Sequence, residues 1–225
     1  MIGSFAILAE PLSAATLANL LQIRPEVVNL RARHLHSVLN VPRNPNHPIR
    51  LLHPSFRDFL LDKDRCSDLK FWVDERQAHQ MLADNCIQLM SNSLKQDVCR
   101  QGAAGTLVAD VDRSLIERCL PPEVRYACLY WIQHLQKSGT QLYDNDHVYQ
   151  FLQEHLLHWL EALSWMGKTS EGILAILSLE SLALVSLLYN ILENPANLFQ
   201  GCQKPLSTLV RLRYLAICPI LPISD

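Results

Sequence analysis

The histidine with the clearest chemical position lies where the sequence predicts that a strand turns into a helix. His53 follows the apolar pair Leu51–Leu52 and precedes Pro54. Proline is favoured in the first turn of a helix because its missing N–H would be unpaired there. The unpaired N–H groups and aligned peptide dipoles of a helix N-terminus attract anions such as phosphate. His53 could therefore add a donor to a bound phosphate, or it could only cap the helix through nearby backbone groups.

The residues around His53 indicate the elements that position it. Phe56, Phe59 and Leu60 recur at helical spacing after Pro54 and predict one buried helical face. Upstream, the segments 38–41 and 49–52 can pair as a small hairpin across a proline- and asparagine-rich loop.

Two short helices precede this hairpin in the sequence. Ser13 can cap the first, and Pro25 opens the second. The link Gln22-Ile23-Arg24 joins them into a helix-turn-helix. A helix-turn-helix followed by a hairpin predicts a winged helix.

The second of these helices offers a different chemistry, because it is basic. Arg31, Arg33 and His34 could enter the major groove of DNA as a recognition helix. However, the stretch from Arg24 to Arg50 has no lysine, and the whole chain has a net charge of −2. Winged helices also serve as protein-packing modules, so the arginines could equally form a solvated or docking surface. A freestanding DNA-binding winged helix is therefore kept as an alternative.

The remainder of the chain predicts an α-helical domain, so the fold class is mainly α. Helices are expected from Asp74 with Gln77 in a capping box, over 122–137, from Asp144 or Asp146 to Leu163, and over 173–192. His79 and Cys86 fall on an apolar face and are expected to pack in the core. Phe71-Trp72-Val73 is expected to be a strand-like anchor.

Two features of this helical region resemble a metal site and a membrane span. Glu154, His155, His158 and Glu161 resemble metal ligands, but a catalytic zinc helix places its histidines at i and i+4, whereas these are at i and i+3. Packed histidines are the simpler interpretation. Residues 173–192 approach the length of a membrane span, yet Glu180 and several serines favour a buried helix.

The composition limits the classes of function. Hydrophobic residues make up 49% of the chain and charged residues 19%, enough for a sizeable core. The seven cysteines are widely spaced and form no C-x-x-C pair, and no signal peptide begins the sequence, so reduced thiols in the cytoplasm are expected. No phosphate loop, nucleophile–base pair or paired carboxylates are visible, so we expect no enzyme activity from this chain.

A resemblance to a known family covers most of the chain. The segment Leu51–Leu60 (LLHPSFRDFL) resembles the winged-helix motif of NACHT-type STAND NTPases, the group that includes animal NLR proteins. Other segments resemble the fungal branch of that group, which includes vegetative-incompatibility proteins and often carries WD repeats. These segments are Pro11–Ser13, His36–Leu39, Pro48–Leu52, Phe71–Glu75 and His155–Leu163, and the resemblance runs from about residue 2 to about residue 180.

The resemblance implies a function for His53. In the family, the histidine at this position contacts the β-phosphate of bound ADP and holds the switch off. The chain would then be a regulatory part of a cell-death or allorecognition switch, which oligomerises when ATP replaces ADP. It would bind no cofactor alone, because ADP or ATP would be shared with a NACHT ATPase in cis or in trans. The phosphate loop, the Mg²⁺-binding acids and the WD repeats of the family have no counterpart here.

The expected organisation has four parts. Residues 1–62 would hold the end of a helix and the winged helix, 63–73 a connector, 74–192 the helical domain and 193–225 a divergent tail expected to be disordered. The opening apolar helix has no N-cap, which suggests a cut start. An inactive truncated remnant is therefore a third interpretation.

Overall fold

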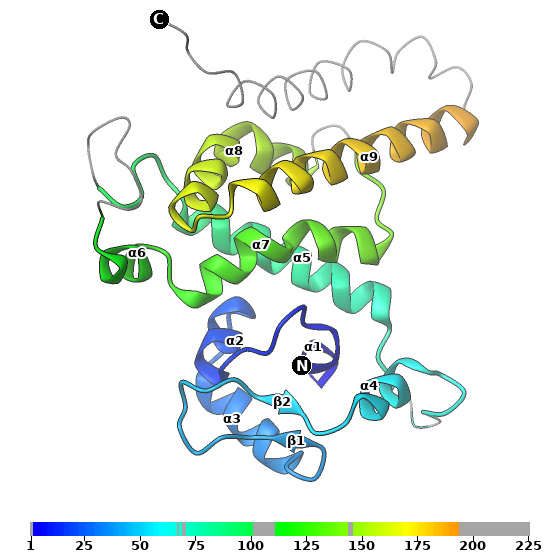
Figure 1. The fold of residues 1–225 in the computed structure, drawn as a ribbon. Coiled ribbons are helices and arrows are strands. Elements are labelled where there is room, and N and C mark those ends of the chain that lie inside the picture. Colours follow the sequence, from blue (N-terminus) through cyan, green and yellow to red (C-terminus); the bar gives the residue numbers. More distant parts are fainter. Residues whose placement is uncertain (1, 67, 69–70, 101–110, 144–145, 194–225) are drawn as a thin grey trace, which may run out of the picture. The chain divides into compact units, whose positions relative to one another are not determined.

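The computed structural model describes residues 2–66, 68, 71–100, 111–143 and 146–193. Of these residues, it describes the side chains of those numbered from 3 to 186. Within them the chain is mainly helical, as predicted, with one two-stranded hairpin (Figure 1). The predicted tail, apart from Glu193, lies outside the described residues. The elements are α1 (Ile2–Ile7), α2 (Ala14–Leu20), α3 (Pro25–His34), β1 (Leu39–Asn40), β2 (Arg50–Leu51), α4 (Pro54–Leu61), α5 (Glu75–Ser93), α6 (Arg113–Cys119), α7 (Pro122–Ser138), α8 (His147–Trp165) and α9 (Thr169–Glu193).

The chain divides into two compact units. The first combines residues 1–93 with 120–139, and the second combines 94–119 with 140–225. Helices α5 and α7 thus belong with the N-terminal elements, whereas α6, α8 and α9 form the second unit. The division predicted from the sequence, with boundaries at 62, 73 and 192, stays a prediction.

The first unit opens with the predicted pair of short helices and the hairpin. The Ser13 hydroxyl accepts the N–H of Thr16 at 3.1 Å and so caps α2, and Pro25 occupies the first turn of α3. Gln22 adopts a φ of 54° in the turn between the two helices. Strands β1 and β2 pair antiparallel within the two segments predicted to form a hairpin, and Leu39 lies opposite Leu51. The assignment of these elements to a winged helix stays a prediction.

Helix α4 corrects one expectation. Of the predicted buried face only Leu60 is buried, whereas Phe59 is 39% exposed and Phe56 is partly exposed. Helix α4 packs on two short elements, α1 and β2, and Leu60 is the residue of the helix that is buried. The apolar pattern of α4 therefore gives it a partly solvent-facing aromatic surface.

Helices α5 and α7 form the core of the first unit. They run antiparallel along each other, because His79 meets His134 while Cys86 lies near Cys128 (Figure 1). The Asp74 carboxylate accepts the N–H of Gln77 at 3.1 Å, which confirms it as the cap of α5. Gly139, at a φ of 69°, ends α7 in the left-handed conformation that glycine adopts without strain.

In the second unit, side-chain caps again set the helix starts. The Asp146 carboxylate accepts the N–H of Tyr149 at 2.7 Å and opens α8, which resolves the alternative left open by the sequence. Asp112 accepts the N–H of Ser114 at 2.9 Å near the start of α6.

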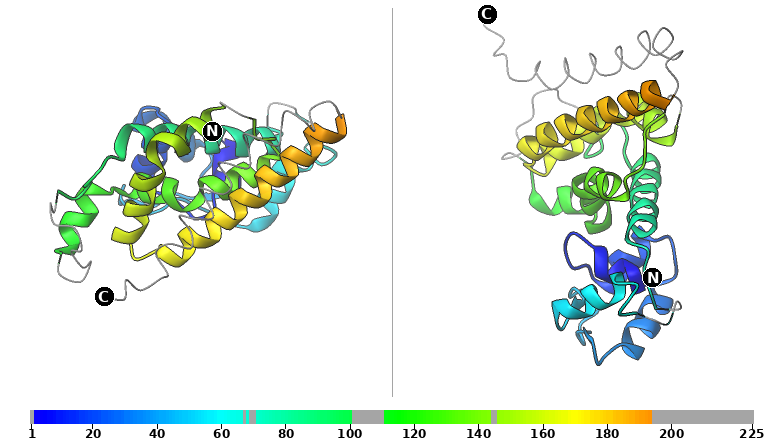
Figure 2. Two further views of the ribbon diagram at one scale, coloured as in Figure 1. Left: turned by 90° about the horizontal axis from the view of Figure 1, so that it is seen from above. Right: turned by 90° about the vertical axis from the view of Figure 1, so that its right-hand side faces the viewer.

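Helix α9, long and straight in Figure 2, is less buried than the sequence predicts. Ile176 and Leu179 are buried, but Leu174 is 64% and Val185 63% exposed. Among the described residues, its stretch Thr169–Ser186 is the one segment long and apolar enough to cross a membrane, judged by length and composition only, and 22% of it is buried.

The segment Phe71–Val73 forms no strand, contrary to the sequence-based expectation. Instead the N–H of Val73 donates to the carbonyl of Leu60 at 2.9 Å, which ties the segment to α4. Gly3 of α1 faces the same residue, and a Cβ placed on Gly3 would lie 2.7 Å from Cγ1 of Val73. Such a distance is shorter than van der Waals contact, so α1 and this segment fit together only because residue 3 has no side chain.

This close approach predicts a compensating pair of substitutions. We expect Gly3→Ala to destabilise the protein by about 1–3 kcal/mol, because the added methyl group overpacks the contact. Val73→Ala removes the opposing methyl groups, so the double variant should lose less than the sum of the two single variants. Urea unfolding of the four proteins measures this coupling. Strictly additive losses would contradict the contact.

Candidate functional site

His53 is held at the start of α4 by its own ring. It occupies the N-cap position with extended backbone angles, and its Nδ1 accepts the backbone N–H of Ser55 at 3.1 Å. The Ser55 hydroxyl lies 2.7 Å from the same nitrogen. The capping alternative considered for His53 is therefore present in the structure.

This hydrogen bond fixes which nitrogen of His53 carries the proton. Because Nδ1 accepts from a backbone donor, the neutral ring must carry its hydrogen on Nε2. The residue is solvent-exposed, and no described residue forms a hydrogen bond to Nε2. The ring therefore uses one nitrogen for the cap and presents an N–H donor outward with the other.

Three apolar residues close to His53 in the sequence are exposed or partly exposed. Leu52, directly before His53, is 56% exposed, and Phe59 on α4 is 39% exposed and stacks against Phe56. We call Leu52, His53, Phe56 and Phe59 the α4 surface. An isolated exposed leucine needs no explanation, but several exposed apolar residues in a group are typical of a contact surface.

Arg57 connects α4 to the core of the first unit. It lies one helical turn after His53, and its guanidinium is 3.5 Å from Oε1 of Glu75, the first residue of α5. Both side chains are more than 40% exposed, at 42% and 45%, so the pair contributes little stability by itself. The pair matters because Glu75 also contacts a buried histidine of the core, His79.

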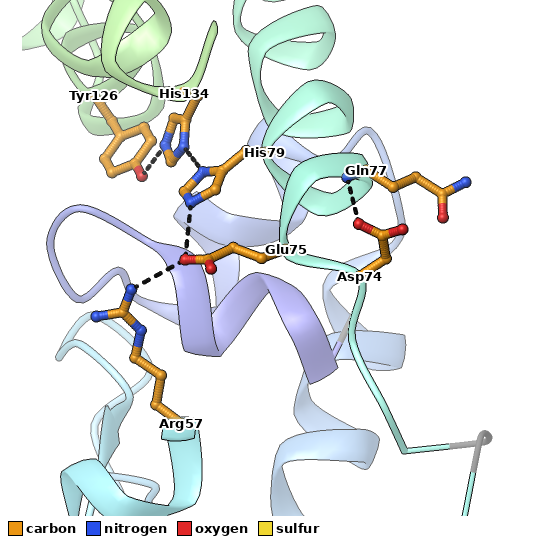
Figure 3. Close-up of polar contacts among 7 residues, drawn as sticks. All are labelled: Arg57, Asp74, Glu75, Gln77, His79, Tyr126 and His134. Carbon is orange, nitrogen blue, oxygen red and sulfur yellow. Dashed lines mark hydrogen bonds and ion pairs between the residues drawn. The ribbon is translucent and has the colours of Figure 1, made fainter. Parts of the chain in front are cut away.

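A chain of polar contacts runs from Glu75 into the core (Figure 3). Nε2 of His79 lies 3.8 Å from the Glu75 carboxylate, and Nδ1 of His79 lies 2.7 Å from Nδ1 of His134. On the other side of His134, Nε2 is 2.8 Å from the hydroxyl of Tyr126, which accepts the N–H of Ala9 at 3.0 Å. We call this series, from Arg57 through Glu75, His79, His134 and Tyr126 to Ala9, the polar chain.

Counting donors gives the polar chain one direction. Since the Tyr126 oxygen accepts from Ala9, its O–H is free to donate to Nε2 of His134. His134 then carries its hydrogen on Nδ1 and donates to His79, whose own hydrogen lies on Nε2 and faces Glu75. In the opposite direction the Tyr126 O–H would have no acceptor in the chain, and a bare His79 nitrogen would face the carboxylate.

Burial keeps both imidazoles neutral. Desolvation lowers the pKa of His134 to about 3, with further lowering by His79 and Lys137. Burial also lowers the pKa of His79, to which Lys137 and Arg57 add while Glu75 opposes them. Burial likewise raises the pKa of the Tyr126 hydroxyl, so that group stays protonated.

The sequence predicted the position of His79 but missed its partner. His79 is buried, as expected, and the pairing with His134 was not expected. The available signal was that His134 falls within the apolar stripe of the helix 122–137, where a polar side chain requires a hydrogen-bond partner. Which residue supplies that partner depends on the packing of α5 against α7, which no local pattern specifies.

The residues named for DNA contact lie on the surface of α3. Arg31, Arg33 and His34 are all exposed. Two residues along a helix correspond to about 200° of rotation, so Arg31 and Arg33 project roughly 160° apart. The structure thus brings none of the three to His53 or to the polar chain by any described hydrogen bond or ion pair.

Three of the four acids and histidines named on α8 contact one another, and Nε2 of His155 lies 3.8 Å from the carboxylate of Glu154. Glu161 accepts the N–H groups of Asp97 and Val98 at 3.1 and 3.2 Å and so holds the segment after α5. Nδ1 of His155 lies 3.3 Å from Nδ1 of His158, and the ring of His155 stacks on Phe151. Among the described residues no group of three or more such side chains could hold a metal ion.

Comparison with known proteins gives one relative. The chain is 30% identical over 203 aligned positions to the vegetative incompatibility protein HET-E-1 of the fungus Podospora anserina. The alignment covers 79% of this chain and 14% of that protein. No model of a known protein family matches the sequence, and no solved structure matches it. The chain is therefore similar to a small part of a fungal vegetative incompatibility protein.

The cap geometry predicts how His53 variants affect stability. His53→Ala should lower the free energy of unfolding by about 1 kcal/mol, because the N–H of Ser55 loses its acceptor. His53→Ser should cost far less, since serine is among the best N-cap residues. Thermal or urea unfolding measures both. Equal losses in the two variants would contradict the capping role.

Proposed function

We propose that this chain is a non-catalytic regulatory module of a NACHT-type nucleotide-operated signalling switch. In this proposal the α4 surface docks on a nucleotide-binding domain, in the same polypeptide or in another, and His53 contacts the β-phosphate of bound ADP. The module thereby stabilises the off state. Exchange for ATP releases it and permits the full-length switch to oligomerise.

The observation that carries the proposal is that the two ring nitrogens of His53 have different roles. Nδ1 of His53 is occupied by the cap, so the exposed Nε2–H is fixed in direction and available to an acceptor from outside. The acceptor would meet the donor at a helix N-terminus, where the peptide dipoles also favour negative charge. A phosphate oxygen is such an acceptor.

The apolar part of the α4 surface supports docking on a protein rather than capture of free nucleotide. One donor and one helix end make too few contacts to hold a nucleotide in water, because ligand binding must offset several kcal/mol of lost rigid-body freedom. Leu52 and Phe59 supply apolar area that a protein partner would bury. The partner would provide the remaining phosphate contacts.

Similarity supports the biological setting. The segment Leu51–Leu60 resembles the winged-helix motif of NACHT proteins, and the relative found is named for vegetative incompatibility. Allorecognition signalling in the cytoplasm is the corresponding role for a switch that contains this module. Since the chain spans 14% of that relative, the activity of any larger assembly belongs to this proposal.

The switch requires a ligand that binds the two states unequally. A ligand with equal affinity for both states would not shift the equilibrium between them. Contact between His53 and the β-phosphate would be made only when the module is docked, so ADP would favour the docked state. DNA binding gains no matching support, because Arg31 and Arg33 project to different sides of α3.

A serine variant tests the phosphate contact without disturbing the fold. In the assembly that the proposal requires, with the nucleotide-binding domain in cis or in trans, His53→Ser keeps the cap and removes the outward donor. One lost hydrogen bond of about 1.4 kcal/mol predicts roughly tenfold faster ADP release. The rate is measured by displacement of a fluorescent ADP analogue.

The matched control is His47→Ser, which changes another exposed histidine away from α4. It should leave ADP release unchanged. Unaltered release in His53→Ser would overturn the phosphate contact. An immunoblot against α8 shows which arrangement applies, since an endogenous band at 25.6 kDa would require the partner domain in trans.

A further inference from the structure

We propose that the buried pair His79 and His134 forms an acid-sensitive clasp, which holds α4 and the end of α1 on the α5–α7 pair and opens when the pair takes up protons. This inference concerns the first unit itself and does not depend on the proposed function.

The ends of the polar chain define what the clasp holds. At one end Glu75 is 3.5 Å from Arg57 of α4, and at the other Tyr126 accepts the N–H of Ala9, two residues after α1. Between these ends the chain passes through one side chain pair contributed by α5 and α7. Helices α1 and α4 also pack on each other, so both attachments act on one pair of elements.

The pair can take up a first proton at His79 without losing the contact between the two rings. If His79 is protonated, its Nε2–H still faces the Glu75 carboxylate, and its Nδ1–H can donate to His134. His134 must then carry its own hydrogen on Nε2, directed at the Tyr126 oxygen. The hydrogen bonds of the chain reverse, and the Tyr126 O–H, which is buried, loses its acceptor.

The pair cannot take up a second proton while the two rings stay in contact. With both imidazoles protonated, Nδ1–H groups would face each other at the 2.7 Å that now separates a donor from an acceptor. Two like charges would also share a site that excludes water, where both side chains are no more than 1% exposed. Full protonation therefore requires that the contact between α5 and α7 opens at this end.

Burial and the charged groups around the pair set the direction of the pH effect. From α5 the pair faces Glu75, from α4 Arg57 and from α7 Lys137, while Tyr126 contacts His134 and lies near the thiol of Cys86. Burial has the largest effect and favours the neutral form, Lys137 and Arg57 add to it, and Glu75 opposes it at His79. Glu75 adjoins His79, which is why His79 takes the first proton.

The sign of the effect follows from these pKa values. Both histidines have a folded-state pKa below their usual value of 6.5, and His134 reaches about 3. Their contribution to stability is complete above pH 6.5 and is lost as the pH falls below it. In that range the folding equilibrium constant should fall up to tenfold per pH unit for each histidine.

The decisive variant replaces both imidazoles by amides. In the double variant His79→Gln/His134→Gln, each side chain keeps a donor and an acceptor and cannot be protonated. Urea unfolding of the full chain between pH 7.5 and pH 5 should show that the free energy of unfolding of the wild type falls steeply with falling pH. In the double variant the slope of this free energy against pH should be smaller, by an amount that corresponds to up to two fewer protons taken up on unfolding. His47→Gln, a change of an exposed histidine, should keep the wild-type slope.

A second measurement on the wild-type chain tests the opening directly and does not require that the double variant folds. Between pH 7 and pH 5, hydrogen-exchange protection factors should fall first at Ala9 and in α4, before those in the middle of α5 and α7. Nitrogen-15 shifts of the imidazoles should show hydrogen on Nδ1 of His134 and on Nε2 of His79 at pH 7. Equal slopes in wild type and double variant, or loss of protection simultaneously throughout the first unit, would overturn the clasp.

Discussion

The first unit depends on the antiparallel packing of α5 against α7. Leu82, Met90, Trp131 and Leu135 are fully buried in these two helices and provide the apolar area that stabilises them. The same packing brings a histidine from each helix together inside the core. A polar pair of this kind is tolerated only when its donors and acceptors are matched, so the register of the two helices is fixed by hydrogen bonding as well as by shape.

The functional surface and the core are connected through α4. His53 begins this helix, and Arg57 one turn later faces Glu75, the first residue of α5. The orientation of the outward donor at His53 therefore rests on two layers of support. Its own ring is fixed by the cap, and the helix that it begins is held on the core by Leu60, by the carbonyl contact to Val73 and by the exposed ion pair.

Local chemistry made the helix boundaries predictable. Ser13, Pro25, Asp74 and Gly139 each act through a few neighbouring atoms, and each marks the boundary that the sequence indicated. His53 was likewise placed correctly between hairpin and helix. Phe59 and α9 were not, because an apolar period shows that a face exists and does not show what covers it. The pairing of His79 with His134 joins residues 55 positions apart and depends on a helix register that no single segment encodes.

The contact between Gly3 and Val73 has a consequence for the start of α5. Val73 is followed directly by Asp74, which caps α5, and then by Glu75. Because residue 3 lies against Val73, α1 packs on the segment that leads directly to the carboxylate beside His79. The first turn of α5 is therefore joined to α1 by direct packing as well as by the chain that runs between them.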